Sequence, residues 1–191
     1  LEVFGDHNLS NLCAAKQICS LLGIFDDEFY SAIANFKGAS NRLEIIYRDN
    51  SKVIIKDFAH SPSKLKASID AVKKQFSNKN IIAVYELHTF SSFSKDFINE
   101  YYGTMSNADI KIIYYDKDVL GKRSEIEIDD NIIKVGFGSN DLKVLSSKTI
   151  LVKNILDNSF NNSVLLLMSS GNFSSLNVKS LIENINEQWE I

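Results

Sequence analysis

The chain has 191 residues, of which 45% are apolar and 24% are charged, and its net charge is −3. These proportions are typical of a globular protein and exclude disordered, collagen-like and coiled-coil chains. The negative charge argues against a nucleic acid as the main partner. No apolar run approaches the roughly 20 residues that a membrane-spanning helix needs, so we predict no membrane partner.

The two cysteines, Cys13 and Cys19, lie close together on one helical pattern. Their spacing is neither that of a disulfide framework nor that of a zinc site, which fits a reducing cytoplasm. The chain starts at Leu1 without a targeting signal, and we therefore expect it to begin inside a larger protein.

The first 35 residues predict two helices. Apolar residues recur at helical spacing in the first, with Asn8 or Ser10 as candidate N-cap and Gly23 as its end. The second helix, over residues 26–34, has acidic residues in its first turn, where the helix dipole favours them. A lysine-glycine pair then breaks the pattern, and we place a domain boundary between residues 35 and 36.

From residue 36 onward, strands alternate with helices. We predict two short strands within residues 43–58, a helix over 61–76, a strand over 81–87, a helix over 93–102, a strand over 111–115, a helix over 130–137, a strand over 142–145, a helix over 148–158, a strand over 164–168 and a helix over 176–189. This alternation predicts crossover connections and an α/β domain with a mostly parallel sheet, spanning residues 36–191.

Ligands of an open parallel sheet bind beyond the carboxyl ends of its strands. Three predicted strands end in polar segments: D-F-A-H-S-P at residues 57–62, E-L-H-T-F-S-S at 86–92 and S-S-G-N at 169–172. Asp57 and His60 can meet a ribose hydroxyl or a phosphate, or Asp57 only caps the following helix. The glycine-containing third segment can bind an anion through backbone N–H groups, or it is an ordinary turn.

Three motifs over residues 5–62 resemble those of the Mur ligases, the ATP-dependent amide-forming enzymes of peptidoglycan synthesis. G-D-H-N-L-S-N at residues 5–11 resembles the family's H-N-x-x-N segment at the end of its central ATPase domain. F-K-G at residues 36–38 and N-R-L-E at residues 41–44 resemble the start of its C-terminal domain. Residues 57–62 match its D-[YF]-A-H-x-P loop. The resemblance implies a Rossmann-like domain with helices on both faces of the sheet, preceded by a helical remnant of the central domain, residues 1–35.

Two Mur ligases that use UDP-N-acetylmuramate resemble the chain best. One joins it to the tripeptide L-alanyl-γ-D-glutamyl-meso-diaminopimelate in peptidoglycan recycling, and the other adds L-alanine. M-S-S-G-N-F at residues 168–173 is similar to the S-[NS]-G-x-F loop of the tripeptide ligase, whereas His88 falls where the alanine ligase also has a histidine. We expect the tripeptide as the amine, with L-alanine as the alternative.

The resemblance also implies the roles of individual residues. In the family, MgATP phosphorylates the substrate carboxylate and the amine attacks the acyl phosphate. The implied nucleotide contacts are Asn8, Asn11, Arg42 and Asp57, the implied catalytic residue near the transferred phosphate is His60, and the implied amine pocket consists of His88, Thr89, Ser169, Ser170, Gly171 and Asn172. None of these is implied as a metal ligand, because the family holds ATP and magnesium mainly in its central domain.

The resemblance thus implies a cytoplasmic ligase whose C-terminal part packs against its own central domain and is inactive alone. The chain itself has no G-x-x-x-x-G-K-[ST] loop for ATP phosphates. Two other classes remain open. One is a Rossmann-like module that binds a nucleotide or a phosphorylated partner without chemistry. The other is a hydrolase with Ser170 as nucleophile, which lacks the support of a G-x-S-x-G motif.

Overall fold

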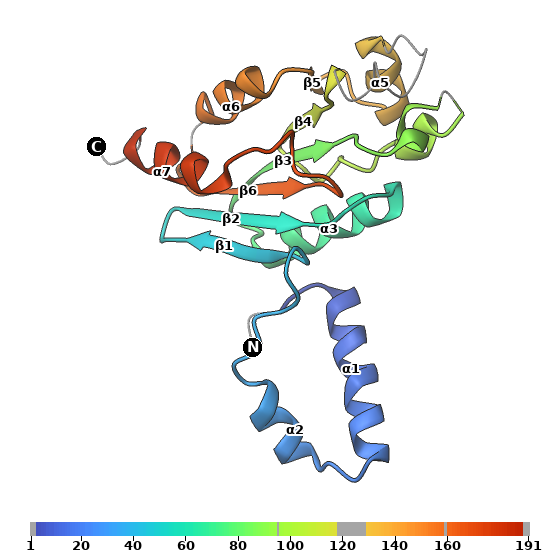
Figure 1. The fold of residues 1–191 in the computed structure, drawn as a ribbon, viewed down its shortest axis with the longest axis vertical. Coiled ribbons are helices and arrows are strands. Elements are labelled where there is room, and N and C mark those ends of the chain that lie inside the picture. Colours follow the sequence, from blue (N-terminus) through green and yellow to red (C-terminus); the bar gives the residue numbers. More distant parts are fainter. Residues whose placement is uncertain (1–2, 95, 118–128, 159, 189–191) are drawn as a thin grey trace.

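The computed structural model describes residues 3–94, 96–117, 129–158 and 160–188. Six strands form one sheet in the order β1-β2-β6-β3-β4-β5 (Figure 1). The strands are β1 (Glu44–Arg48), β2 (Lys52–Asp57), β3 (Asn80–Glu86), β4 (Ile110–Tyr114), β5 (Lys143–Leu145) and β6 (Ser163–Met168). Only β1 and β2 pair antiparallel, and the other neighbours pair parallel. The predicted α/β fold with a mostly parallel sheet is confirmed.

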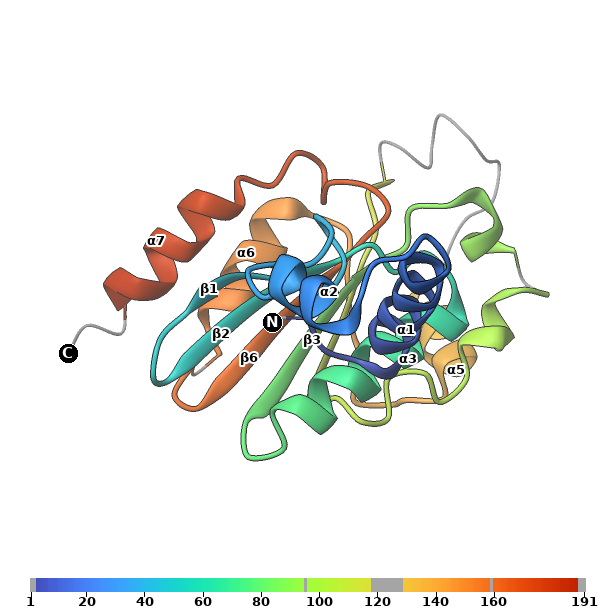
Figure 2. The ribbon, with the colours of Figure 1, turned by 90° about the horizontal axis from the view of Figure 1, so that it is seen from below.

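Helices cover both faces of the sheet, as Figures 1 and 2 show together. The helices α3 (Pro62–Gln75) and α5 (Asp130–Phe137) pack on one face, and α6 (Lys148–Leu156) and α7 (Val178–Gln188) pack on the other. The central strand β6 supplies both cores, because successive side chains of a strand point to opposite faces. Leu166 belongs to the core under α3 and α5, and its neighbours Leu165 and Leu167 belong to the core under α6 and α7.

The single helix predicted over residues 93–102 is wrong. The chain forms two short 3-10 helices there, η1 (Phe90–Phe93) and η2 (Ile98–Tyr101). Gly136 of α5 touches η2 so closely that a Cβ at this position would lie 2.9 Å from the carbonyl oxygen of Ile98. This contact buries Tyr101, whose ring stacks on that of Phe137 with centroids 4.8 Å apart. Tertiary packing therefore outweighs the helical preference of the segment.

The helices α1 (Asp6–Leu21) and α2 (Asp26–Ile33) extend away from the sheet and form what we call the arm, residues 3–36 (Figure 1). No residue of α1 is buried, and α2 buries only Phe29. Large apolar side chains are exposed along the arm: Leu9, Ile18, Leu21, Leu22, Ile24, Phe25, Tyr30 and Phe36. The domain boundary at residues 35 and 36 stays a prediction.

The start of α1 differs from the expected one. Its N-cap is Gly5, with a φ of 90°, so the predicted caps Asn8 and Ser10 are wrong. Glycine adopts this φ without steric cost, and a Cβ at Gly5 would lie 3.1 Å from the Cβ of Ala71 in α3. Asn8 instead donates a hydrogen bond to the carbonyl of Phe4 over 2.9 Å.

The other predicted elements are present, with ends close to those expected. The predicted end of the last helix, Trp189, lies outside the described residues. Within the described ranges, no helix has both the length and the apolar character needed to cross a membrane.

We expect the amide protons of α1 to exchange with solvent well before those of β6, because no residue of α1 is buried and every residue of β6 is buried. Native-state hydrogen exchange measured by NMR on the 191-residue chain compares the two. Equal protection would contradict the weak packing of the arm.

The turn between β1 and β2 is closed by one carboxylate. Oδ1 of Asp49 accepts hydrogen bonds from the backbone N–H groups of Ser51 and Lys52, both over 2.7 Å, and the Tyr47 hydroxyl donates to Oδ2 over 2.9 Å. Partial burial raises the pKa of Asp49, but these hydrogen bonds outweigh it and hold the pKa well below its usual range. The ionised carboxylate therefore stabilises the folded chain.

A group whose pKa is lowered by folding contributes stability above its unfolded pKa, about 4 for aspartate, and loses it as the pH falls. We expect Asp49→Asn to lower the free energy of unfolding by about 1 kcal/mol at pH 7, a modest value because water screens this part-exposed side chain. The difference between wild type and variant should shrink between pH 5 and pH 3. Urea unfolding at these pH values measures it, and a constant difference would exclude a role of the charge.

Candidate functional site

The three polar segments come together at one edge of the sheet. The strands β2 and β3 flank β6 on either side, so the loops after all three strands adjoin. The backbone N–H of Ser169 donates to the carbonyl of Asp57 over 3.0 Å, which joins the loop after β6 to the loop after β2. The edge is the carboxyl end of the parallel strands, where the sequence predicts ligands.

The predicted nucleotide contacts on the arm share a cavity. A space of about 360 Å³ is lined by Asn8 and Asn11 of α1 and by Arg42. Arg42 belongs to the linker between the arm and β1, residues 37–43. Its apolar walls come from Leu12, Ala15, Phe29, Ile33 and Phe36. Apolar walls fit the faces of a planar base, and amide side chains offer both a donor and an acceptor to its edge. The donor set therefore fits a nucleotide base, whose binding here stays a prediction.

A larger cavity, of about 590 Å³, lies beside β1 and the end of α3. It contains none of the predicted site residues. Its position away from the carboxyl edge of the sheet sets it apart from the site.

Asp57 stabilises the linker between the arm and the sheet. Its buried carboxylate accepts a hydrogen bond from the backbone N–H of Leu43 over 2.9 Å and one from the hydroxyl of Ser68 over 2.6 Å. Leu43 has a φ of 48°, a left-handed conformation that this bond helps to hold. The reading of Asp57 as a helix cap is wrong, because the N-cap of α3 is Ser61 and no side chain caps it. Contact of Asp57 with a ribose stays a prediction.

The ring of Phe58 contacts two predicted site residues. The guanidinium carbon of Arg42 lies 5.2 Å from the centroid of the Phe58 ring, and the centroid of the His60 ring lies 5.4 Å from the same point. Nδ1 of His60 is 3.1 Å from the carbonyl of Phe58, within the same loop. His60 is exposed, so its ring is accessible to a ligand at the edge. Phe58 thus contacts both Arg42, which lines the arm cavity, and His60 of the loop after β2.

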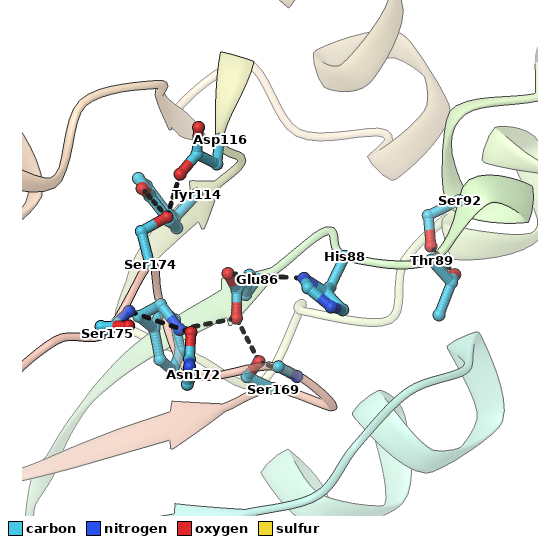
Figure 3. Close-up of polar contacts among 12 residues, drawn as sticks. Glu86, His88, Thr89, Ser92, Tyr114, Asp116, Ser169, Asn172, Ser174 and Ser175 are labelled. Atoms are coloured by element: carbon cyan, nitrogen blue, oxygen red, sulfur yellow. Dashed lines mark hydrogen bonds and ion pairs between the residues drawn. The ribbon is translucent and has the colours of Figure 1, made fainter. Parts of the chain in front are cut away.

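Glu86 is a site residue that the sequence reasoning did not single out. Oε2 of this buried carboxylate accepts hydrogen bonds from the hydroxyl of Ser169 and, over 2.9 Å, from the backbone N–H of Phe173 (Figure 3). The N–H of Gly171 donates to Oγ of Ser169 over 2.6 Å. The N–H groups of Gly171 and Phe173 are therefore directed at protein oxygens and not at an external anion. The sequence signal that could have found Glu86 is a carboxylate at the carboxyl end of an otherwise apolar strand.

His88 and Thr89 point to different neighbours. Nδ1 of His88 lies 3.8 Å from Oε1 of Glu86, and 35% of the His88 side chain is exposed. Thr89 hydrogen-bonds Ser92 and lies on the far side of His88 from Glu86 (Figure 3). The structure therefore brings His88 to the loop after β6, whereas the Thr89 hydroxyl contacts Ser92.

Asn172 has a structural contact of its own. Its Oδ1 accepts a hydrogen bond from the N–H of Ser175 over 2.9 Å, and the residue is exposed. Ser170 is part-exposed on the same loop. Both side chains are accessible at the edge, and their contact with a substrate stays a prediction.

The residues that the structure describes hold no group of three or more His, Cys, Asp or Glu side chains that could bind a metal ion. Magnesium prefers carboxylates and phosphate oxygens in octahedral geometry. Within the described residues, the side chains therefore offer no donor set that fits the ion.

Comparison with known proteins identifies the family. Residues 41–171 match the family model described as Mur ligase, glutamate ligase domain. The UDP-N-acetylmuramate–L-alanine ligase of Persephonella marina is 33% identical over 92% of this chain. The chain belongs to the Mur ligase family. Mur ligases are ATP-dependent ligases of peptidoglycan synthesis, and the chain spans 38% of the length of the Persephonella relative.

Two solved structures confirm the fold. The UDP-N-acetylmuramate–alanine ligase of Thermotoga maritima matches 98% of this chain and 39% of its own, with a TM-score of 0.72 and 21% identity. The murein peptide ligase of Psychrobacter arcticus matches 95% of this chain and 38% of its own, with a TM-score of 0.65 and 22% identity. The Rossmann-like domain that the sequence motifs imply is therefore that of the Mur ligase C-terminal part.

We expect Asp57→Ala to lower the free energy of unfolding by about 2–4 kcal/mol, because it leaves the buried N–H of Leu43 and the hydroxyl of Ser68 without their acceptor. Ser68→Ala removes one of these bonds and should cost about 1 kcal/mol. Urea unfolding of the chain compares both variants with wild type. Equal costs would show that the Leu43 bond contributes nothing.

Proposed function

We propose that this chain is the C-terminal part of a UDP-N-acetylmuramate–L-alanine ligase that forms an amide bond and releases ADP. The observation that carries the proposal is the 33% identity over 92% of the chain to the Persephonella ligase of that name. The sequence of the loop at residues 168–173 favours the tripeptide as the amine. Because of the identity to this relative, we instead propose L-alanine as the preferred amine. The reaction is placed in the cytoplasm, where ATP and UDP-linked sugars occur.

Residues of this chain form the closing half of the site in this proposal. Asn8 and Asn11 bind the base in the arm cavity, and Arg42 meets the ribose or the phosphates. His60, exposed beside Phe58, lies near the transferred phosphate. Bound ATP supplies the phosphoryl group that activates the substrate carboxylate. The main contribution of this chain is positioning and charge neutralisation, and the chain alone is inactive.

The amine binds at the loops after β3 and β6. His88 is the candidate partner for the carboxylate of the incoming amino acid, because its part-exposed ring lies beside the loop of residues 169–172. Ser170 and Asn172 present short polar side chains at the same edge, and the buried Ser169 joins their loop to Glu86.

The apolar arm supports packing against a central domain. Leu21, Leu22 and Phe25 are 87%, 76% and 77% exposed at its tip. Contiguous apolar side chains of this size mark an interaction surface. In our proposal the rest of the ligase covers them, and the UDP-N-acetylmuramate pocket lies in that part.

The tripeptide of peptidoglycan recycling is the second candidate amine. The loop at residues 169–172 offers this amine the part-exposed side chain of Ser170 and the exposed side chain of Asn172. The S-[NS]-G-x-F similarity of this loop favours the same amine.

The deciding experiment assays the complete ligase that carries this chain for ADP release with UDP-N-acetylmuramate and ATP. One arm adds L-alanine and the other adds the tripeptide. We expect kcat/KM for L-alanine to be at least about tenfold higher, or roughly 1.4 kcal/mol. Preference for the tripeptide would replace the amine but keep the ligase. No ADP release with either amine would contradict the ligase and favour a binding module.

We also expect Asn11→Ala to raise the KM for ATP about three- to tenfold, because it removes an amide from the arm cavity. The KM for the amine should stay unchanged, since the cavity lies away from the loop after β6. Asn154→Ala is the matched control, because this asparagine is a part-exposed residue of α6 that lines no part of the arm cavity. A change of both KM values in Asn11→Ala would contradict a local role.

A further inference from the structure

The loop between β6 and α7 contains an unusual backbone segment. Phe173, Ser174 and Ser175 have φ values of 50°, 53° and 60°, so three consecutive residues other than glycine are left-handed. Each such residue costs roughly 1–2 kcal/mol, because its Cβ approaches the following carbonyl oxygen. A run of three persists only where the surroundings determine it, and such segments cluster at functional sites.

Side chains at the ends of two strands, β3 and β4, hold this segment. Glu86 at the end of β3 accepts the N–H of Phe173, and the ring of Phe173 is buried in the core under α6 and α7. The Ser174 hydroxyl donates to the carboxylate of Asp116, which follows β4, and hydrogen-bonds the Tyr114 hydroxyl over 2.8 Å (Figure 3). Glu86 also contacts the start of the loop, because its carboxylate accepts the hydroxyl of Ser169.

The same carboxylate lies in a three-way contact with the loop and His88. A Cβ at Gly171 would lie 2.9 Å from Oε2 of Glu86 and 2.7 Å from Nδ1 of His88. Glycine is therefore required for the loop to approach this pair. Because the backbone of Gly171 lies against the imidazole, a shift of the loop changes the surroundings of His88 directly.

We propose that Glu86 is the positioning residue of the amine pocket. Its carboxylate takes up the loop's own donors, holds residues 173–175 in the left-handed turn, and fixes Gly171 and His88 against each other. The carboxylate of an incoming amine then meets His88 and not the N–H of Phe173. The role in amine binding rests on the proposed ligase, whereas the role in holding the loop concerns the chain alone.

The first test measures hydrogen exchange by NMR on the 191-residue chain. In Glu86→Ala we expect protection of the Phe173 amide to fall at least about tenfold while that of Leu165 in β6 is kept. Glu86→Gln keeps the size of the side chain and one acceptor, so it should show a smaller loss and remains usable if the alanine variant does not fold. Unchanged Phe173 protection in a folded Glu86→Ala, or in Glu86→Gln where only that variant folds, would overturn the proposal.

The second test measures KM values in the complete ligase. Glu86→Gln should raise the KM for the amine at least about fivefold and leave the KM for ATP within about twofold, a split that general loss of stability would not produce. Asp49→Asn is the matched control. The Asp49 carboxylate also holds a turn by accepting backbone N–H bonds, but it lies before the start of β2, at the edge of the sheet opposite to the amine pocket. It should change neither value.

The outcomes separate the two proposals. Equal increases of both KM values, or no change in either, would overturn the positioning role. A wild-type ligase without activity would overturn the proposed function, and the exchange measurement would still decide whether Glu86 holds the loop.

Discussion

Asp57 and Glu86 are the last residues of β2 and β3, the two strands that flank β6. Each carboxylate is buried, and each accepts one serine hydroxyl and one backbone N–H. The N–H belongs in both cases to a left-handed residue, Leu43 or Phe173. Hydrogen bonds to a charged group are about twice as strong as neutral ones, so a buried carboxylate can hold backbone that would otherwise relax. The loops of the site depend on these two side chains.

The pair also connects the two halves of the site. Asp57 fixes the linker that carries Arg42 toward the arm cavity, and Glu86 fixes the loop that faces His88. Between them lies β6, whose following residue, Ser169, bonds both the backbone of Asp57 and the side chain of Glu86. A nucleotide bound at the arm and an amine bound at the sheet edge would therefore meet on one rigid element, which favours precise positioning of reacting groups.

Much of the fold could be predicted from the sequence, because the alternation of apolar strands and amphipathic helices is a local signal. The strand at residues 163–168 is one example, since burial on both faces makes it almost wholly apolar. The helix expected over 93–102 failed because the approach of Gly136 to Ile98 is not visible in the local pattern. Glu86 was missed for the same reason, since the N–H that it accepts lies 87 residues further along the chain.

The structural role of Asp57 shows a different limit of sequence reasoning. Its position just before a helix is that of an N-cap, and the motif around it resembles a family loop, so both readings direct attention to the helix start. The carboxylate in fact turns toward Leu43 and Ser68. The decisive donors belong to a residue with positive φ and to a buried hydroxyl, neither of which local composition reveals.

The loop after β6 is held by a near balance of opposing terms. Three left-handed residues cost about 3–6 kcal/mol together. Two hydrogen bonds to the Glu86 carboxylate contribute about 3–6 kcal/mol, and burial of the Phe173 side chain contributes about 2 kcal/mol. Without the carboxylate, the burial of Phe173 and the Ser174 hydrogen bonds to Asp116 and Tyr114 remain, and they offset less of the backbone strain. The carboxylate at the end of β3 therefore stabilises the left-handed turn, and the positions of the residues that face the substrate edge depend on it.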